Sequence, residues 1–304
     1  MSVVIAALAP VAALIALGWL LKRRRFPGDG FWAPAERLTY FLLLPALIVG
    51  SLGRARFAAL EPAPMVIALA TALVIAAGVM MALRRRLGVD GPAFSSLFQG
   101  SIRLNVYIGF VGALALWGDA GLTFAAVAVA TYVPVVNVLS VAVLSRYAGA
   151  AAADWGGVGR ELVRNPLIIA CVVGLALNLT GLGSAAALDG ALAVLGRAAL
   201  ALGLLCVGAG LSFAGLSHAG RGIAAVCAVK LVAVPAATAA LCALFGVGGA
   251  AAGVAVLFAA LPTATSAFIL ARQMGGDATL MAQVIAATHL AAAFTLPVIL
   301  VAFV

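Results

Sequence analysis

Two clusters of polar residues interrupt apolar segments of this sequence, and they are the residues best placed to bind a solute. The first lies at 100–109 and holds an arginine, an asparagine and a tyrosine; the second lies at 261–266 and holds a proline and three hydroxyl side chains. Proline removes a backbone donor and breaks a helix, and nearby hydroxyls then satisfy the freed backbone or meet a ligand. A proline kink with hydrogen bonds between helices is the alternative interpretation. The candidate binding residues are, in chain order, Arg103, Asn105, Tyr107, Lys230, Pro262, Thr263, Thr265 and Ser266.

The two basic candidates, Arg103 and Lys230, indicate the charge of the solute. Both lie inside apolar segments, where an ionised side chain costs at least about 3 kcal/mol and is a functional hypothesis by default. The nine acidic residues map to connections or helix ends, so neither cation has an obvious carboxylate partner. An anionic substrate would supply the missing charge. The alternative is that both side chains extend to the membrane surface or bond to backbone carbonyls.

Other chemistries find no support in the sequence. It has no HExxH motif, no intramembrane aspartate pair and no serine elbow flanked by glycines, so no enzyme is predicted. The four cysteines lie in apolar runs without CxxC spacing, which indicates core packing rather than disulfides or metal ligands. No cofactor or metal is expected. The net charge of +9 does not indicate a nucleic-acid partner, because in a membrane protein the positions of the basic residues matter more than their total charge. No nucleic-acid partner is expected.

The composition requires membrane-spanning helices to position these residues. Of the 304 residues, 66% are hydrophobic and only 9% are charged, which is too little polar surface for a soluble chain of this length. Apolar runs of about 20 residues recur, and each can cross a bilayer as a helix. The fold class predicted is an all-α polytopic membrane protein with ten transmembrane helices. The predicted spans are 3–21, 37–53, 65–83, 95–117, 121–145, 164–182, 187–213, 222–245, 250–271 and 279–303.

The basic residues also predict the orientation of the bundle. Thirteen of them fall in alternate connections on one side, whereas the opposite side carries only Arg54 and Arg56. Cytoplasmic loops are enriched in lysine and arginine, so the thirteen should be cytoplasmic and both termini should lie outside the cytoplasm. The chain is therefore expected to be a multi-pass protein of the cell (inner) membrane.

An internal repeat divides the chain into two halves. Gly118-Asp119 opens span 5 and Gly276-Asp277 opens span 10, at an offset of 158 residues. A further match at an offset of 160 aligns Asn105 with Thr265, so the two polar clusters occupy equivalent spans. Chance similarity between alanine- and leucine-rich helices is the alternative. Because five spans is an odd number, the halves must be inverted relative to one another, as they are in secondary transporters. The predicted halves are 1–153 and 154–304.

Segments in nearly all ten spans together resemble the auxin efflux carrier family of membrane transporters, which has bacterial members and is similar to the bile acid:sodium symporters. The resembling segments are 41–48, 103–109, 133–140, 164–168, 230–235 and 261–263, with the Gly-Asp corner at Asp277. The resemblance implies two inverted five-helix halves, with spans 1, 2, 6 and 7 as a scaffold and spans 3–5 and 8–10 as a moving transport domain. It also implies that spans 4 and 9 unwind and cross near the substrate, with Asn105 and Pro262 at the crossing.

Two features depart from that family pattern. Many members carry a second proline shortly after the asparagine, whereas residues 108–112 here read Ile-Gly-Phe-Val-Gly. The plant exporters have a carboxylate that supports the site from span 3, and this sequence has none between Met65 and Leu83. The second departure argues against plant-like substrate handling and against proton coupling through such a carboxylate.

The leading prediction is a secondary carrier that moves a small organic anion, such as a carboxylate, by alternating access. Asn105, Thr263 and Thr265 would hydrogen-bond the substrate, the N-termini of half-helices would favour its charge, and Lys230 and Arg103 would add positive potential. A sodium-coupled symporter of the bile-acid type is the first alternative, and a membrane sensor or scaffold without transport is the second. The predicted partners are a small anionic solute, the lipid bilayer and a second copy of the chain bound through the scaffold helices.

Overall fold

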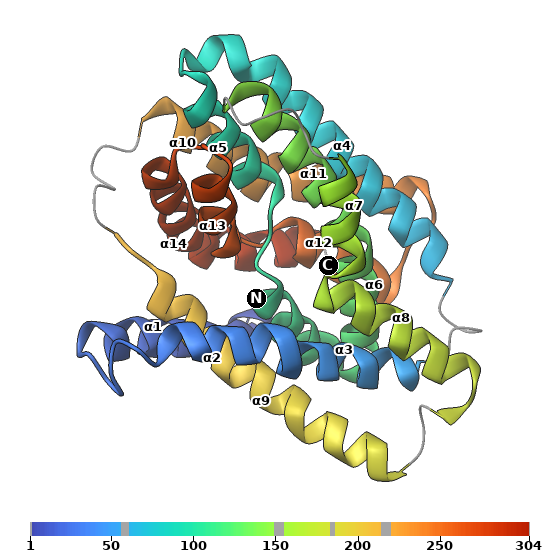
Figure 1. The fold of residues 1–304 in the computed structure, drawn as a ribbon. Helices are drawn as coiled ribbons and strands as arrows, with labels where there is room; N and C mark the ends of the chain where they lie inside the picture. Colours follow the sequence, from blue (N-terminus) through green and yellow to red (C-terminus); the bar gives the residue numbers. More distant parts are fainter. Residues whose placement is uncertain (1, 56–60, 149–154, 183–185, 214–219, 304) are drawn as a thin grey trace.

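The computed structural model describes residues 2–55, 61–148, 155–182, 186–213 and 220–303, and the parts of the chain that it describes are helices and the turns that join them (Figure 1). Arg56 and the predicted boundary between the halves at 153/154 lie outside these residues. The elements are α1 (Ser2–Arg23), α2 (Trp32–Leu38), the π-helical turn η1 (Thr39–Leu43), α3 (Leu44–Gly53), α4 (Pro62–Leu87), α5 (Gly91–Ile102), α6 (Val106–Tyr147), α7 (Trp155–Val163), α8 (Pro166–Leu179), α9 (Ala186–Gly210), α10 (Arg221–Ala228), the π-helical turn η5 (Val229–Ala233), α11 (Val234–Leu244), α12 (Gly249–Ala259), α13 (Ser266–Gln273) and α14 (Ala278–Phe303).

Several of these helices are long and apolar enough to cross a membrane. Seven continuous apolar segments qualify within the described residues, and the longest, Gly91–Tyr147, holds two of the predicted spans. It is kinked at Gly118, whose φ of 58° and ψ of −142° are not helical. The shorter apolar helices α8 and α12 fall in predicted spans 6 and 9. The lengths and composition indicate a multi-pass membrane protein, and the number of ten spans stays a prediction.

Local sequence sets several helix ends. α4 ends at Leu87 and is followed by Gly88, whose φ of 62° is readily adopted by glycine. Asp90 then caps α5 by accepting a hydrogen bond from the Ala93 N–H at 2.9 Å. Asp277 caps α14 in the same way through the Leu280 N–H at 2.9 Å. The short helix α7 lies in a connection for which the sequence predicts no element, because the span pattern was sought only in long apolar runs.

Two apolar runs are interrupted where the sequence predicts interruption. Predicted span 4 consists of α5 and the first part of α6, with extended backbone at Arg103 and Asn105. Predicted span 9 consists of α12 and α13, with a non-helical segment between Ala260 and Thr265. The first interruption contains no proline, so the second proline that many family members carry is not needed to break this helix.

The helices pack as two groups. The first helix group comprises α1, α2, α3, α8 and α9: α1 packs along α9, and α3 packs against α8 and α9. The second helix group comprises α4, α5, α6 and α10 to α14, with α6 packed against α4, α5 and α12. Figure 1 shows α1, α2, α3 and α9 together in the lower part of the view and α4, α5, α10, α13 and α14 above them.

Glycines allow the closest approach within the first helix group. A methyl group at Gly18 of α1 would overlap the backbone carbonyl of Leu205, and one at Gly208 of α9 would overlap the carbonyl of Ile15. Helices in lipid have no hydrophobic driving force between them, so close packing through small residues contributes much of their association. The α1–α9 interface is therefore a rigid contact between two backbones.

We expect Gly18→Ala to lower the thermal unfolding midpoint of the purified protein, because the new methyl group must push α1 away from α9. Overpacking of this kind costs about 1–3 kcal/mol. The matched control is Gly78→Ala on α4, where the added methyl group meets no atom within 4 Å. The midpoint is measured in detergent for both variants and the parent. Equal midpoints for Gly18→Ala and Gly78→Ala would contradict the close contact.

Candidate functional site

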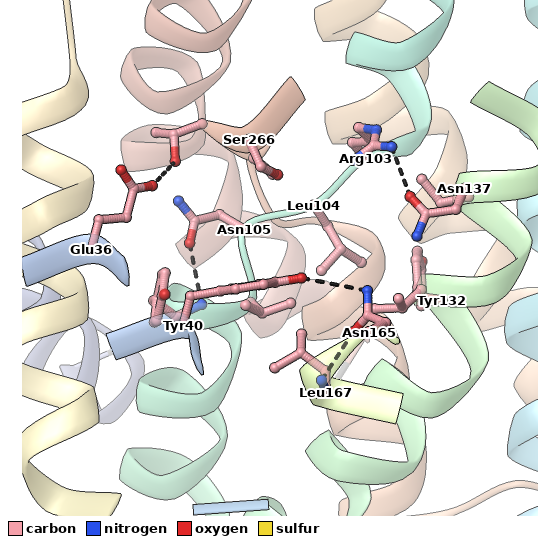
Figure 2. A pocket seen from close by; sticks show the side chains of 16 residues that line it. Glu36, Tyr40, Arg103, Leu104, Asn105, Tyr132, Asn137, Asn165, Leu167 and Ser266 are labelled. Carbon is pink, nitrogen blue, oxygen red and sulfur yellow. Dashed lines mark hydrogen bonds between the residues drawn. The ribbon is translucent and has the colours of Figure 1, made fainter. Parts of the chain in front are cut away.

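A cavity of about 110 Å³ with both polar and apolar lining residues lies where the two interrupted helices meet (Figure 2). Residues of both interruptions line it, together with residues of α2, η1, α6 and the beginning of α8. The cavity thus brings together both helix groups. Its polar lining residues are Glu36, Tyr40, Arg103, Asn105, Tyr107, Tyr132, Asn137, Asn165, Thr265 and Ser266.

The two interruptions hold each other together through hydrogen bonds. The backbone N–H of Asn105 donates to the carbonyl of Pro262 at 3.0 Å. The hydroxyl of Thr263 donates to the carbonyl of Gly100 at 2.7 Å, and the Thr263 N–H donates to the Thr288 hydroxyl at 3.2 Å. A buried backbone group without a partner costs about 1–3 kcal/mol, so these bonds make non-helical backbone tolerable at this depth.

Asn105 is fixed in orientation by bonds on both sides of its amide. Its Oδ1 accepts from the Tyr107 N–H at 3.2 Å and caps α6, and its Nδ2 lies 3.4 Å from Nε2 of His289. His289 Nδ1 lies 2.8 Å from the carbonyl of Ile285, which can only accept, so Nδ1 carries the proton. Nε2 then accepts from the Asn105 amide. His289 of α14 therefore forms a hydrogen bond between helices that holds the buried Asn105 in place.

Arg103 brings a positive charge to the cavity. Its Nη2 donates to Oδ1 of Asn137 on α6 at 2.8 Å, and both side chains line the cavity. Figure 2 shows this pair on the side of the cavity opposite Glu36. An arginine guanidinium stays protonated in proteins, so Arg103 contributes a positive charge to this side of the cavity.

Three helix N-termini border the cavity. Val106 begins α6, Ser266 begins α13 and Leu167 lies in the first turn of α8, and all three residues line the cavity. Asn165 caps α8 by accepting from the Leu167 N–H at 2.9 Å, and its Nδ2 donates to the Tyr40 hydroxyl at 3.4 Å. Helix N-termini carry partial positive charge and free N–H groups, so three of them around one cavity favour a negatively charged occupant.

Two tyrosine hydroxyls add unused hydrogen-bonding capacity. The Tyr107 and Tyr132 side chains line the cavity, and their buried hydroxyls have no hydrogen-bond partner among the residues that the structure describes. Buried polar groups in native proteins are usually satisfied, so these two hydroxyls are unusual among the described residues.

Glu36 directly precedes predicted span 2, among the acidic residues expected in connections or at helix ends. The helix begins earlier than predicted, at Trp32, and Glu36 lines the cavity within its second turn. The Thr265 hydroxyl donates to Glu36 Oε1 at 3.5 Å. The buried positions Trp32, Ala35 and Thr39 are spaced three to four residues apart. This helical spacing was the signal that could have extended the span.

The structure brings five of the eight candidate residues to the cavity and leaves three outside its lining. Arg103, Asn105, Tyr107, Thr265 and Ser266 line it. Thr263 is fully buried in its bonds between the interruptions. Pro262 lines a separate, apolar cavity of about 330 Å³ between α1 and α14. Lys230 is 1% exposed in η5 and lines neither of these cavities. Tyr40, Tyr132, Asn137 and Asn165 are lining residues that the sequence analysis did not select as candidates.

Comparison with known proteins gives one family match. Residues 156–300 match the model of a family described as membrane transport protein. The matched part contains the second interruption and two of the three helix N-termini that border the cavity, those of α8 and α13. No curated protein matches the chain.

The cap of α8 can be tested separately from any activity. Asn165→Ala removes the acceptor for the first turn of α8 and should lower the unfolding free energy by about 1 kcal/mol. Asn165→Asp keeps an acceptor in the same place and should retain most of the stability. Thermal midpoints of the two purified variants measure the difference. If both midpoints fall equally, the cap geometry described for Asn165 is incorrect.

Proposed function

The chain belongs to the membrane transport protein family, which is the family of the auxin efflux carriers, and we propose that it is a secondary carrier for a small organic anion. The match confirms the family that the sequence resembles, and the family makes the protein a membrane transporter. Carboxylates are the class of anion that the proposal names, and alternating access is the mechanism.

One observation carries the proposal: a cavity with the chemistry of an anion site lies where two interrupted helices meet. Three helix N-termini border it, and the Arg103 guanidinium and the Asn105 amide lie in its lining. Each helix N-terminus favours a negative charge by about 0.3–1 kcal/mol when exposed, and by more when partly buried. A volume of about 110 Å³ suits a small solute.

The candidate residues take different roles in this proposal. The Asn105 amide, the hydroxyls of Thr265 and Ser266 and the phenol of Tyr107 would bond the anion, and Arg103 would balance its charge. Pro262 and Thr263 would hold the interruptions in place, because their bonds join the two breaks. Lys230 would contribute positive potential from outside the cavity, without touching the substrate.

Helix boundaries support the inverted-repeat architecture as part of the proposal. α3 ends at Gly53 and α9 at Gly210, and α5 begins at Gly91 and α12 at Gly249, so the offsets are 157 and 158 residues. α1 of the first half packs on α9 of the second half, and α3 of the first half packs on α8 of the second. A two-fold relation between the halves would produce this pair of equivalent contacts. The first helix group would be the scaffold and the second the transport domain. The proposed halves are 1–153 and 154–304.

We propose that the cavity faces the cytoplasm in this structure. Glu36 and Tyr40 lie near the start of the helix that follows the basic segment Lys22–Arg25, and Asn165 follows Arg164. The positive-inside rule places these ends in the cytoplasm, in an inner membrane with both termini outside. Beyond the interruptions, Phe110 packs edge-on against Phe258 with centroids 6.3 Å apart, which would close the opposite side.

The binding groups can be tested by flux measurements in liposomes containing the purified protein. Uptake of labelled malonate, succinate, lactate and benzoate is compared for the parent, Asn105→Ala and Thr265→Val. Each hydrogen bond to a charged group contributes about 1.5–3 kcal/mol, so each variant should lose roughly tenfold or more of the parent's uptake at low substrate concentration. Thr180→Val, which changes an exposed threonine at the end of α8, is the matched control and should transport normally.

Two results would count against the proposal. Variants as active as the parent would remove this site, and a parent that transports none of the four anions would remove the function. Replacing sodium by choline in the same assay tests the sodium-coupled alternative, which requires uptake to fall.

A further inference from the structure

A carboxylate joins the two helix groups at the candidate site. Glu36 belongs to α2, which packs against α9 in the first helix group. The Thr265 hydroxyl, which donates to Glu36 Oε1 at 3.5 Å, immediately precedes α13, which packs against α14 and α5 in the second. Figure 2 shows the Glu36 carboxylate on the same side of the cavity as Asn105. The contact therefore forms or breaks whenever the groups move relative to one another.

An ionised Glu36 would oppose the binding of an anion in two ways. It occupies the Thr265 hydroxyl, which is a donor that the anion needs. It also places a second negative charge in one small cavity, where like charges disfavour each other more strongly than in water. Along this cavity, within the described chain, the ionic side chains are Arg103 and Glu36, so the charge of a bound anion would add to that of an ionised Glu36. A proton on Glu36 removes both obstacles.

The other titratable neighbours of Glu36 do not change this balance. Three elements packed around the cavity each bring one such group close to Glu36, and none is charged in its ordinary form near neutral pH. The three groups are Tyr40 of η1, Tyr107 of α6 and Cys206 of α9. The charged residue next to Glu36 on α2, Arg37, is exposed.

We propose that Glu36 is the proton-binding residue of the carrier, so that the anion and a proton bind together and cross as a pair. The inference rests on the proposed function, because it requires a transported anion. A proton gradient directed into a vesicle then drives the anion in the same direction.

The test compares uptake at two external pH values in liposomes with an internal pH of 7.5. Labelled malonate and succinate are the probes, since their doubly charged forms cross lipid slowly. For one proton taken up per anion, the parent's initial uptake at pH 6.5 should exceed that at pH 7.5 by up to about tenfold. Glu36→Gln, which cannot ionise, should give a ratio of about one, whatever its absolute rate. Glu61→Gln, a change at an exposed glutamate, is the matched control and should keep the parent's ratio.

Two further measurements keep the test decisive if Glu36→Gln is inactive or unstable. Glu36→Asp should retain a ratio above one, because it keeps an ionisable carboxylate on α2. A pH-sensitive dye trapped with the parent should report internal acidification that depends on the added malonate or succinate.

The proposal is overturned if Glu36→Gln keeps the parent's ratio, if Glu36→Asp loses it while still transporting, or if the parent takes up either anion without a proton. A parent that moves neither anion refutes the proposed function for these substrates instead, so the two failures are distinguishable.

Discussion

Backbone groups in an apolar medium must find partners, and this constraint determines how the site is built. Interrupting a helix frees amide and carbonyl groups that lipid cannot satisfy. Here the first interruption donates from Asn105 to the carbonyl of Pro262, and the second donates from Thr263 to the carbonyl of Gly100. Each break thus completes the other, and neither would be tolerable alone. The same pairing aims two helix N-termini at one cavity, so the means of satisfying the backbone also produces the binding potential.

The two charged residues that line the cavity in the described chain belong to different helix groups. Arg103 is held by Asn137 within the second group, so its charge stays with the proposed moving part. Glu36 belongs to the first group and reaches across to Thr265. A substrate bound to Arg103 would therefore travel with its cation and be presented to Glu36 at one end of the movement. In the proposed mechanism, the protonation of Glu36 in the first helix group would then influence whether the loaded site is stable.

The interruptions could be predicted from the sequence because their signals are local. Proline and clustered hydroxyls mark the second break, and the repeat offset locates the first opposite it. Glu36 could not be found from hydropathy, since a charged residue at the end of an apolar run is indistinguishable from one in a connection. Lys230 shows the converse difficulty: its depth along the chain is clear, but the direction of its side chain depends on the π-helical turn η5, which changes the register of the helix. The composition of a segment predicts how deep a residue lies in the membrane, whereas the direction of its side chain depends on how the helices pack.

Packing also indicates which surfaces can slide. Within the first helix group, α1 and α9 approach so closely at Gly18 and Gly208 that a single methyl group would overlap backbone atoms, and a contact of that kind admits one arrangement. Between the two helix groups, the contact of Thr265 with Glu36 is a long hydrogen bond between flexible side chains, which solvent or a solute can replace. A carrier needs a rigid unit and an exchangeable interface beside it. The backbone contacts at Gly18 and Gly208 lie within one group, whereas the replaceable hydrogen bond between Thr265 and Glu36 lies between the groups, as the proposed alternating access would require.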